Sequence, residues 1–242
     1  MKSTKLVDAF QRARKDTTYA VIEGAQALKH AVRFGADIEQ VVTYDISLLE
    51  KLLDELAQDV KKSIIPGVEE VEEKVFSQLS PHPPRTKVIA LARRSTYRVS
   101  DIAPDQPVVF LEDPRDLENI GAVIRVAAAA GVAGVVVSGP VDIWHPAVIR
   151  GAAGLHYALP VLNSPLEVLR KGRPAISLDP TGTVIQQGSV PQNAILIFGT
   201  ERHGISQATL ADSDQVIRLP MKEGVSSLNL ATSVAATLYQ LG

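Results

Sequence analysis

Short apolar runs alternate with longer segments of helical periodicity through the second half of the chain. Apolar residues spaced three or four apart between the runs are typical of amphipathic helices. Strands that alternate with helices predict a parallel sheet, and thus an α/β fold. The apolar runs lie at residues 108–111, 135–137, 160–162, 175–178, 195–198 and 216–219.

The first hundred residues predict a smaller α/β unit. Its expected strands lie at residues 19–23, 38–44, 64–65 and 88–91, and its expected helices at residues 25–34, 48–60 and 68–79. A stretch rich in Ser, Asp and Pro then separates it from the alternating pattern. We therefore expect a first domain at residues 1–95, a linker at 96–106 and a second domain at 107–242.

The composition narrows the functional class. A chain of 242 residues with 45% hydrophobic and 21% charged residues is ordinary for a globular protein. No apolar run reaches the length of about 18 residues that a membrane span needs, and the N-terminus lacks the apolar core of a signal peptide. Because the chain has no cysteine, disulfides, thiolate catalysis and Cys-ligated zinc are excluded. We expect a cytoplasmic protein with no membrane partner.

The net charge of −2 does not favour nucleic-acid binding, but the charge is uneven. Residues 1–15 hold five basic side chains, residues 85–98 hold five and no acid, and residues 50–74 hold eight acids against four lysines. Basic clusters of this size predict phosphate contacts, and a solvated surface is the alternative that charge leaves open. The candidate RNA-binding residues are Arg85, Lys87, Arg93, Arg94, Arg98 and Arg150.

The stretch at residues 195–241 is the first candidate site. A predicted strand ends in a glycine-rich turn at residues 199–204, and a second strand ends before a polar loop and a helix. In open α/β sheets, ligands bind where strand ends meet helix N-termini. The motifs of P-loop, dinucleotide, nucleophile-elbow and zinc-protease sites are missing, and the five histidines show no ligand spacing. We therefore expect no metal site.

Three polar sets carry the candidate chemistry, and each has an ordinary alternative. Asn119 is expected to cap a helix that carries Arg125. An arginine on such an apolar helix is costly to bury without a partner. The alternative to a functional role is that Arg125 forms a structural salt bridge with an acid such as Glu112. Glu201 lies between Gly199 and Gly204, and the ordinary alternative is a surface acid in a glycine-rich turn. Ser226, Ser227 and Asn229 begin the last helix, as an ordinary N-cap would.

The three polar sets are more specific when they are taken together in their order along the chain. The stretches DPRDLENIGAVIRVAAAAGV, LIFGTERHGIS with VIRLPM, and SSLNLATSVAATLYQL resemble three successive motifs of the SpoU/TrmH-type RNA ribose methyltransferases of the SPOUT superfamily. Together they span residues 113–241. The stretch AVIEGAQALKHAVRFGADIEQVVTYD is similar to the opening of the family's N-terminal substrate-binding domain, which resembles RNA-binding ribosomal proteins.

The resemblance implies a C-terminal domain whose parallel sheet carries a deep trefoil knot, although ordinary chains are unknotted. It implies S-adenosylmethionine as cofactor and a homodimer through the C-terminal domain that completes the active site. The implied cofactor-binding residues are Gly199, Leu219 and Leu228, largely through their backbone, with Thr200 and Met221 close by. The implied catalytic residue is Arg125, and the residues implied to line and fix the site are Asn119, Glu201, Ser227 and Asn229.

The chemistry suits these residues. Methyl transfer from a sulfonium is an in-line displacement that depends on alignment, and a neutral ribose hydroxyl is a poor nucleophile. A guanidinium stays protonated. We therefore expect Arg125 to position the hydroxyl and stabilise its charge, while the proton leaves to a phosphate or water.

Some positions depart from the family pattern. Ala152, Ala153 and Ala231 stand where many members have serine, and residues 81–86 (PHPPRT) replace the usual stretch. We expect a ribose 2′-O-methyltransferase of structured RNA. Ribosomal RNA is the first expected substrate, and transfer RNA is the second. The alternatives are a catalytically silent RNA-binding or ribosome-associated protein with the same fold, and base methylation on that fold.

Overall fold

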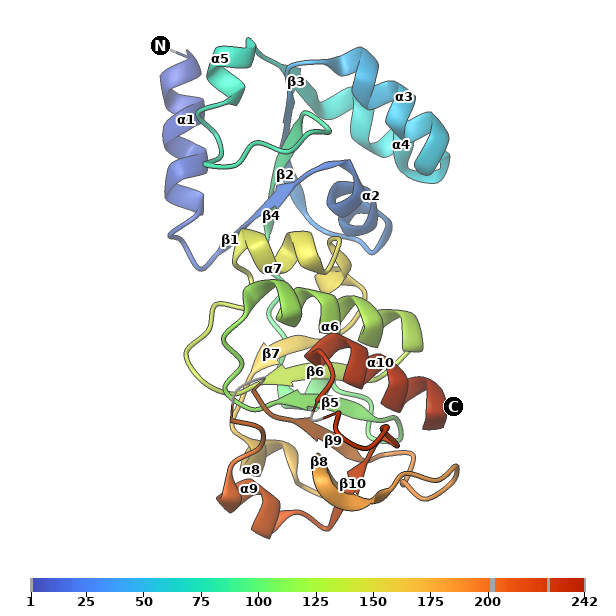
Figure 1. Cartoon of the computed structure of the whole chain (residues 1–242). Coiled ribbons are helices and arrows are strands. Elements are labelled where there is room, and N and C mark those ends of the chain that lie inside the picture. The colour runs from blue at the N-terminus through green and yellow to red at the C-terminus, as the bar shows by residue number, and fades with distance from the viewer. Residues whose placement is uncertain (1, 201–202, 226, 242) are drawn as a thin grey trace. The chain divides into compact units, whose positions relative to one another are not determined.

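The computed structural model of the protein describes residues 2–200, 203–225 and 227–241, and its elements are labelled in Figure 1. The chain divides into two compact units. The first comprises Met1–Ser95 and Trp144–Ala158, and the second comprises Thr96–Ile143 and Leu159–Gly242. The segment Trp144–Ala158, which we expected within the second domain, thus packs within the first unit.

The first unit is built on a four-stranded sheet of order β1-β4-β2-β3, with β4 antiparallel to both neighbours and β3 parallel to β2. Its strands are β1 (Tyr19–Glu23), β2 (Ile38–Thr43), β3 (Val68–Glu70) and β4 (Val88–Arg93). Its helices are α1 (Lys2–Ala13), α2 (Ala25–Arg33), α3 (Ile46–Leu56), α4 (Gln58–Ile64), α5 (Glu73–Phe76) and α7 (Pro146–Gly151), with single 3-10 turns at Ile65–Gly67 and Leu155–Tyr157. Phe10 of α1 and Phe76 of α5 are fully buried in the core on one face of this sheet.

Three sequence predictions in this unit are wrong. The helix expected at 48–60 is two helices, because the backbone of Ala57 leaves the helical region (φ −163°, ψ 49°). The strand expected at 64–65 ends α4 and begins a 3-10 turn. The helix expected at 68–79 begins as β3, where Val68 pairs with Val41 of β2. Pairing with a neighbouring strand outweighed the helical spacing of the valines.

The second unit is built on a six-stranded sheet of order β10-β8-β9-β5-β6-β7, in which every neighbouring pair is parallel. Its strands are β5 (Val108–Leu111), β6 (Gly134–Val137), β7 (Val161–Asn163), β8 (Ala175–Val184), β9 (Ile195–Phe198) and β10 (Gln215–Arg218). Each lies where an apolar run predicted a strand, which confirms the α/β fold with a parallel sheet. β8 is longer than expected. It runs past β10 at Gly182, where a Cβ would come within 2.6 Å of the Val216 backbone.

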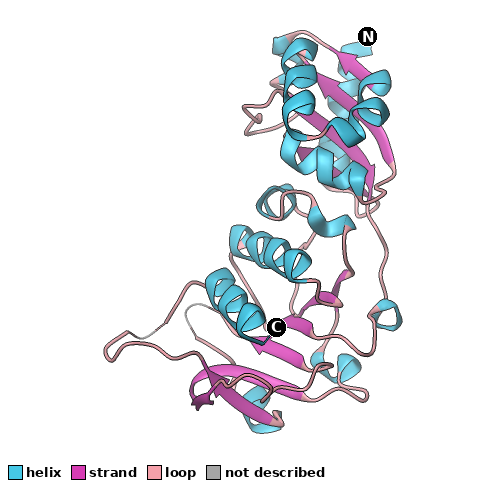
Figure 2. Cartoon of the chain, turned by 90° about the vertical axis from the view of Figure 1, so that its right-hand side faces the viewer, coloured by secondary structure: helices cyan, strands magenta, loops and turns pink. Residues whose placement is uncertain are grey.

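Helices cover both faces of this sheet (Figures 1 and 2). α6 (Leu117–Ala130) and α10 (Leu230–Leu241) pack side by side on one face, and α8 (Leu166–Leu169) and α9 (Gln207–Asp212) lie on the other. A 3-10 turn, η2 (Val99–Asp101), precedes the sheet. Because both faces are covered, consecutive residues of β5 and β9 are all buried, as their unbroken apolar sequence requires. Among the described residues, no helix has the length and apolar character needed to cross a membrane.

Candidate active site

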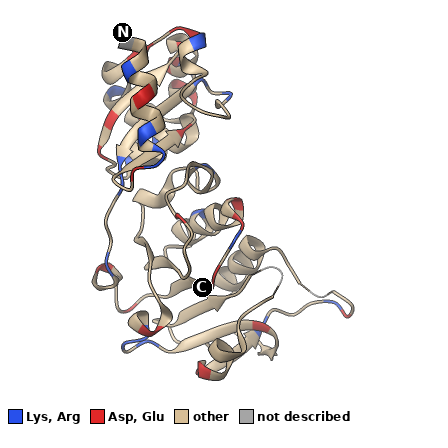
Figure 3. Ribbon diagram, turned by 90° about the vertical axis from the view of Figure 1, so that its left-hand side faces the viewer, with Lys and Arg blue, Asp and Glu red and all other residues tan. Residues whose placement is uncertain are grey.

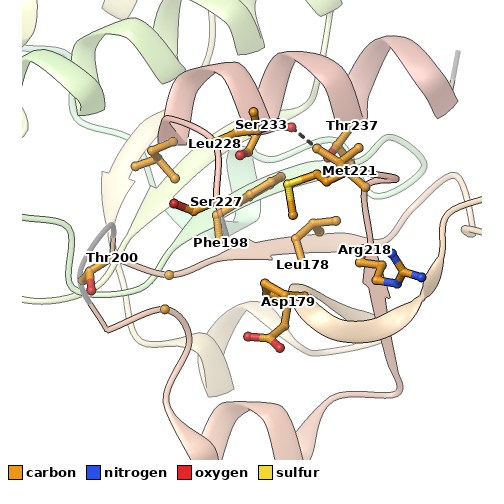
Figure 4. A pocket seen from close by; sticks show the side chains of 15 residues that line it. Leu178, Asp179, Phe198, Thr200, Arg218, Met221, Ser227, Leu228, Ser233 and Thr237 are labelled. Atoms are coloured by element: carbon orange, nitrogen blue, oxygen red, sulfur yellow. Dashed lines mark hydrogen bonds between the residues drawn. The ribbon is translucent and has the colours of Figure 1, made fainter. Parts of the chain in front are cut away.

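A cavity of about 340 Å³ lies between the middle of β8 and the carboxyl ends of β9 and β10, beside the start of α10 (Figure 4). Leu178, Phe198 and Met221 form much of its apolar lining. The site thus lies at the sheet edge where parallel α/β folds bind ligands. Its volume falls at the lower end of the range of about 300–1,000 Å³ that is usual for small-molecule sites.

The five residues expected to bind a cofactor all line this one cavity. They come from the loops that follow β9 and β10, and Ser227 from the catalytic candidates joins them. The five are Gly199, Thr200, Leu219, Met221 and Leu228. The fold therefore brings together residues that are up to 29 positions apart in the sequence. Their role in holding a cofactor stays a prediction.

The loop after β9 is tightly folded back on itself. Thr200 N donates to Gly204 O at 3.1 Å, and Gly204 N donates to Thr200 O at 2.9 Å. A Cβ on Gly199 would lie 2.0 Å from the carbonyl carbon of Gly204, so only glycine fits there. Close backbone approach thus shapes this wall of the cavity.

The other catalytic candidates lie at the start of α10 and on α6. Asn229 Oδ1 accepts from Thr232 N at 3.2 Å and caps α10, while Asn229 Nδ2 donates to Asn119 Oδ1 at 2.8 Å. The expectation that Asn119 caps α6 is wrong. Asp116 is the cap, since its carboxylate accepts from the backbone of Glu118 and Asn119, both at 2.9 Å. The side chain of Asn119 instead accepts the hydrogen bond from Asn229.

Arg125 lies on the exposed side of α6. Within the described part of the chain, its guanidinium has no hydrogen-bond or ion-pair partner. The alternative in which Arg125 pairs with Glu112 is wrong, because Glu112 instead accepts hydrogen bonds from Ser206 and Thr209. Arg125 does not line the cavity, and its guanidinium is open to a partner from outside the described chain.

Glu201 and Ser226, the remaining candidates, lie outside the described residues. Among the residues that are described, no group of three or more His, Cys, Asp or Glu could hold a metal ion.

The sequence interpretation missed several lining residues. Asp179 follows the buried part of β8, Arg218 ends β10, and Ser233 and Thr237 face the cavity from α10. Thr237 is fully buried and donates to Ser233 O at 2.8 Å. Ser233 and Thr237 lie four residues apart in a mainly apolar helix and so share one face, and this spacing was the signal that could have identified that face.

The basic cluster at residues 85–98 does not form one patch. Lys87 precedes β4 and Arg93 ends it, so the two lie about 20 Å apart along the strand. Arg98 belongs to the second unit. Basic and acidic residues are interspersed over the first unit (Figure 3). An extended strand therefore separates basic residues that are close in sequence, and their contact with RNA stays a prediction.

Most of these basic side chains already have acidic or backbone partners. Lys87 Nζ lies 3.0 Å from Asp45 Oδ2, and this contact raises the pKa of Lys87. Arg93 pairs with Glu39 at 2.5 Å, and Arg94 Nε donates to Tyr19 O at 2.6 Å.

Two further candidates lie in the same unit. Arg150 lies 3.4 Å from the buried carboxylate of Glu23. Arg85 is exposed and forms no hydrogen bond or ion pair with any residue that the structure describes. RNA binding by these residues remains a prediction.

The sequence model of the SpoU rRNA Methylase family matches residues 106–239. Over 247 aligned residues, the chain is 26% identical to the 23S rRNA (adenosine(1067)-2′-O)-methyltransferase of Streptomyces azureus, covering 98% of this chain and 90% of that one.

Two solved structures share the fold. The crystal structure of an RNA 2′-O ribose methyltransferase is similar with a TM-score of 0.78 and 27% identity, covering 99% of this chain and 94% of that one. The SpoU methyltransferase AviRb from Streptomyces viridochromogenes, crystallised with AdoMet, has a TM-score of 0.76 at 21% identity, with 96% of each chain covered. The family match spans the whole of the cavity and the Asn119–Arg125 helix, and the chain belongs to the SpoU rRNA methylase family.

Proposed function

We propose that the protein transfers a methyl group from S-adenosylmethionine to a ribose 2′-hydroxyl of structured RNA, with ribosomal RNA as the substrate class and transfer RNA second. The observation that carries the proposal is the single cavity lined by all five cofactor-motif residues. Family membership supports the methyl transfer, and the Streptomyces azureus relative is named for 2′-O-methylation of 23S rRNA.

The cavity fits the cofactor in size and chemistry. Apolar side chains such as Leu178 and Met221 suit an adenine ring, and Asp179 and Arg218 offer one charge of each sign to a zwitterionic amino-acid end. Gly199, Leu219 and Leu228 would hold the cofactor largely through backbone atoms. When bound, it supplies an activated methyl group on a sulfonium centre.

Arg125 is assigned to the ribose hydroxyl. A guanidinium is a cation with a planar fork of N–H donors, so Arg125 orients the 2′-oxygen and stabilises the negative charge that develops there. The proton leaves to a phosphate or to water. Asn119 and Asn229 hold the start of α10, and thereby Ser227 and Leu228, against the cavity. Glu201, which lies outside the described residues, keeps the role in the active site that the family resemblance implies.

We further propose that the C-terminal segment forms a deep trefoil knot. The middle of β8 and the loops after β9 and β10 converge on one cavity, although β9 lies between β8 and β5 in the sheet. After β10 the chain returns to the opposite face, where α10 packs beside α6. This crossing of loops at one place supports a threaded path.

We propose a homodimer through the C-terminal domain, with Arg125 supplied by the second subunit. The absence of Arg125 from the cavity lining supports this arrangement, as do the exposed apolar side chains of Val225, Leu228 and Tyr239 around α10. Co-expression of Arg125→Ala with Gly199→Val tests it. A shared site restores activity in the mixed dimer, whereas sites confined to one subunit leave it inactive.

The first domain, residues 1–95, is proposed to bind the RNA, and the reaction is placed in the cytoplasm, where such RNA is found. The decisive experiment maps ribose 2′-O-methylation in total RNA with and without the protein. A new 2′-O-methyl site supports the proposal. Products that are methylated only on bases would contradict ribose methylation and support base methylation. Failure to bind S-adenosylhomocysteine in calorimetry would favour a catalytically silent RNA-binding protein.

A further inference from the structure

We propose that Glu112 is a positioning residue of the cofactor cavity. Its carboxylate fixes the end of the glycine loop, defined as residues 199–206 (described at 199–200 and 203–206), and thereby sets the affinity for S-adenosylmethionine. The inference rests on the proposed function, since it names a residue that acts through the same cavity.

Glu112 directly follows β5 in the middle of the sheet, and both of its carboxylate oxygens are engaged. Oε2 accepts from Ser206 N at 2.7 Å, and Oε1 accepts from Ser206 Oγ at 2.9 Å and from Thr209 Oγ1. All three donors lie where the glycine loop joins α9. Hydrogen bonds to an ionised carboxylate are among the stronger ones in proteins, and they are directional.

Apolar packing alone does not hold this junction. α9 has six residues and buries none of them fully, and Leu210 alone packs, partly buried, against the core cluster. Its far end is held separately, by Ser213 Oγ at 2.7 Å from Ser177 Oγ. Ile205 is buried in the core, but apolar burial is non-directional and does not orient the neighbouring backbone. The direction in which the loop leaves the cavity therefore depends on Glu112.

The junction is coupled to the cavity wall through the backbone. Ser206 follows Ile205 and Gly204, and the backbone of these two packs so closely against Gly199 that a Cβ at that position would lie only 2.0–2.3 Å from it. Gly199, Thr200 and Gly204 all line the cavity. A displacement of Ser206 therefore moves Ile205 and Gly204, and through them the wall that would contact the cofactor. The same displacement does not move the side of α6 that carries Arg125.

The test is calorimetry of S-adenosylhomocysteine binding to the full-length protein. Glu112→Gln keeps the shape but turns an amide N–H toward a donor, and we expect at least about fivefold weaker binding. Glu112→Ala should weaken it by about tenfold or more. Asp113→Asn is the matched control, because this carboxylate lies on the same turn and, among the residues that the structure describes, pairs with the exposed Arg115 alone. We expect its binding constant to change by less than about twofold.

A kinetic readout separates positioning from general loss of structure. In Glu112→Gln, the KM for S-adenosylmethionine should rise while the KM for RNA stays unchanged. If the Glu112 variants do not fold, the double variant Ser206→Ala with Thr209→Val removes the side-chain donors and leaves Glu112 in place. It too should bind several-fold more weakly.

The outcomes distinguish two failures. If the wild-type protein does not bind S-adenosylhomocysteine, the proposed function fails. If the wild type binds it and the folded Glu112 or Ser206/Thr209 variants bind it equally well, only the role of Glu112 is overturned.

Discussion

Asn229 and Asn119 lie 110 residues apart in the sequence and share a hydrogen bond of 2.8 Å between Nδ2 and Oδ1. The bond joins the start of α10 to the first turn of α6. Through its Oδ1, the same Asn229 caps α10 at Thr232 N. One side chain thus links the helix that carries Arg125 to the loop that lines the cavity.

Substituting the two asparagines should therefore have unequal effects. Asn119→Ala removes the link but leaves the cap, so we expect several-fold weaker S-adenosylhomocysteine binding and a slightly lower Tm. Asn229→Ala removes both, and the loss of a cap costs about 1 kcal/mol more. Calorimetry and thermal unfolding measure the difference. Equal Tm values for the two variants would contradict the double role of Asn229.

Arg125→Ala should leave cofactor binding unchanged and lower turnover by about 10²-fold or more, because stabilisation of a developing negative charge is worth that much. Arg125→Lys should recover only part of the loss, since an ammonium lacks the planar fork of the guanidinium. Transfer of a labelled methyl group to RNA measures turnover, and calorimetry measures binding. Full activity in Arg125→Ala would remove its assigned role.

Gly199→Ala should weaken cofactor binding by more than about tenfold and destabilise the fold, because its Cβ would overlap the Gly204 backbone at 2.0 Å. Gly67→Ala is the control, since no heavy atom lies within 4 Å of a Cβ at that position. Calorimetry with S-adenosylhomocysteine compares the two. Normal binding by Gly199→Ala would show that the loop can open at no cost.

Asp214 should make the second unit sensitive to acid. Its Oδ2 accepts from Ala175 N at 2.7 Å and from Arg170 at 3.0 Å, and chiefly the backbone bond lowers the pKa of Asp214 below its ordinary value of 3.8. A carboxylate with a lowered pKa stabilises the fold above its unfolded-state pKa and loses this effect as the pH falls through the folded one.

Asp214→Asn should therefore have a Tm that is a few degrees lower at pH 7. The difference from the wild type should begin to shrink as the pH falls through the unfolded-state pKa of about 4. It should disappear below the lowered folded-state pKa, where the wild-type carboxyl is also neutral. Thermal unfolding of both proteins over a pH series measures it. A difference that does not change with pH would show that the charge of Asp214 contributes nothing.

Much of the fold could be predicted from the sequence. Residues 108–111 and 195–198 form strands with the predicted bounds, because unbroken apolar runs of this length are stable only inside a sheet covered on both faces. Gly131 ends α6 in the left-handed conformation, as glycine after a helix does. The five residues that the family resemblance implied for the cofactor line one cavity, and their binding of it stays a prediction.

The tertiary structure decided which side chains meet. Glu112 pairs with Ser206 and Thr209 and not with Arg125, and the basic residues around β4 lie at opposite ends of the strand. Apolar periodicity is a local property of the chain, so the sequence by itself determined the elements. Polar partners depend on distances between segments that are far apart in the sequence, and only the packed fold sets those distances.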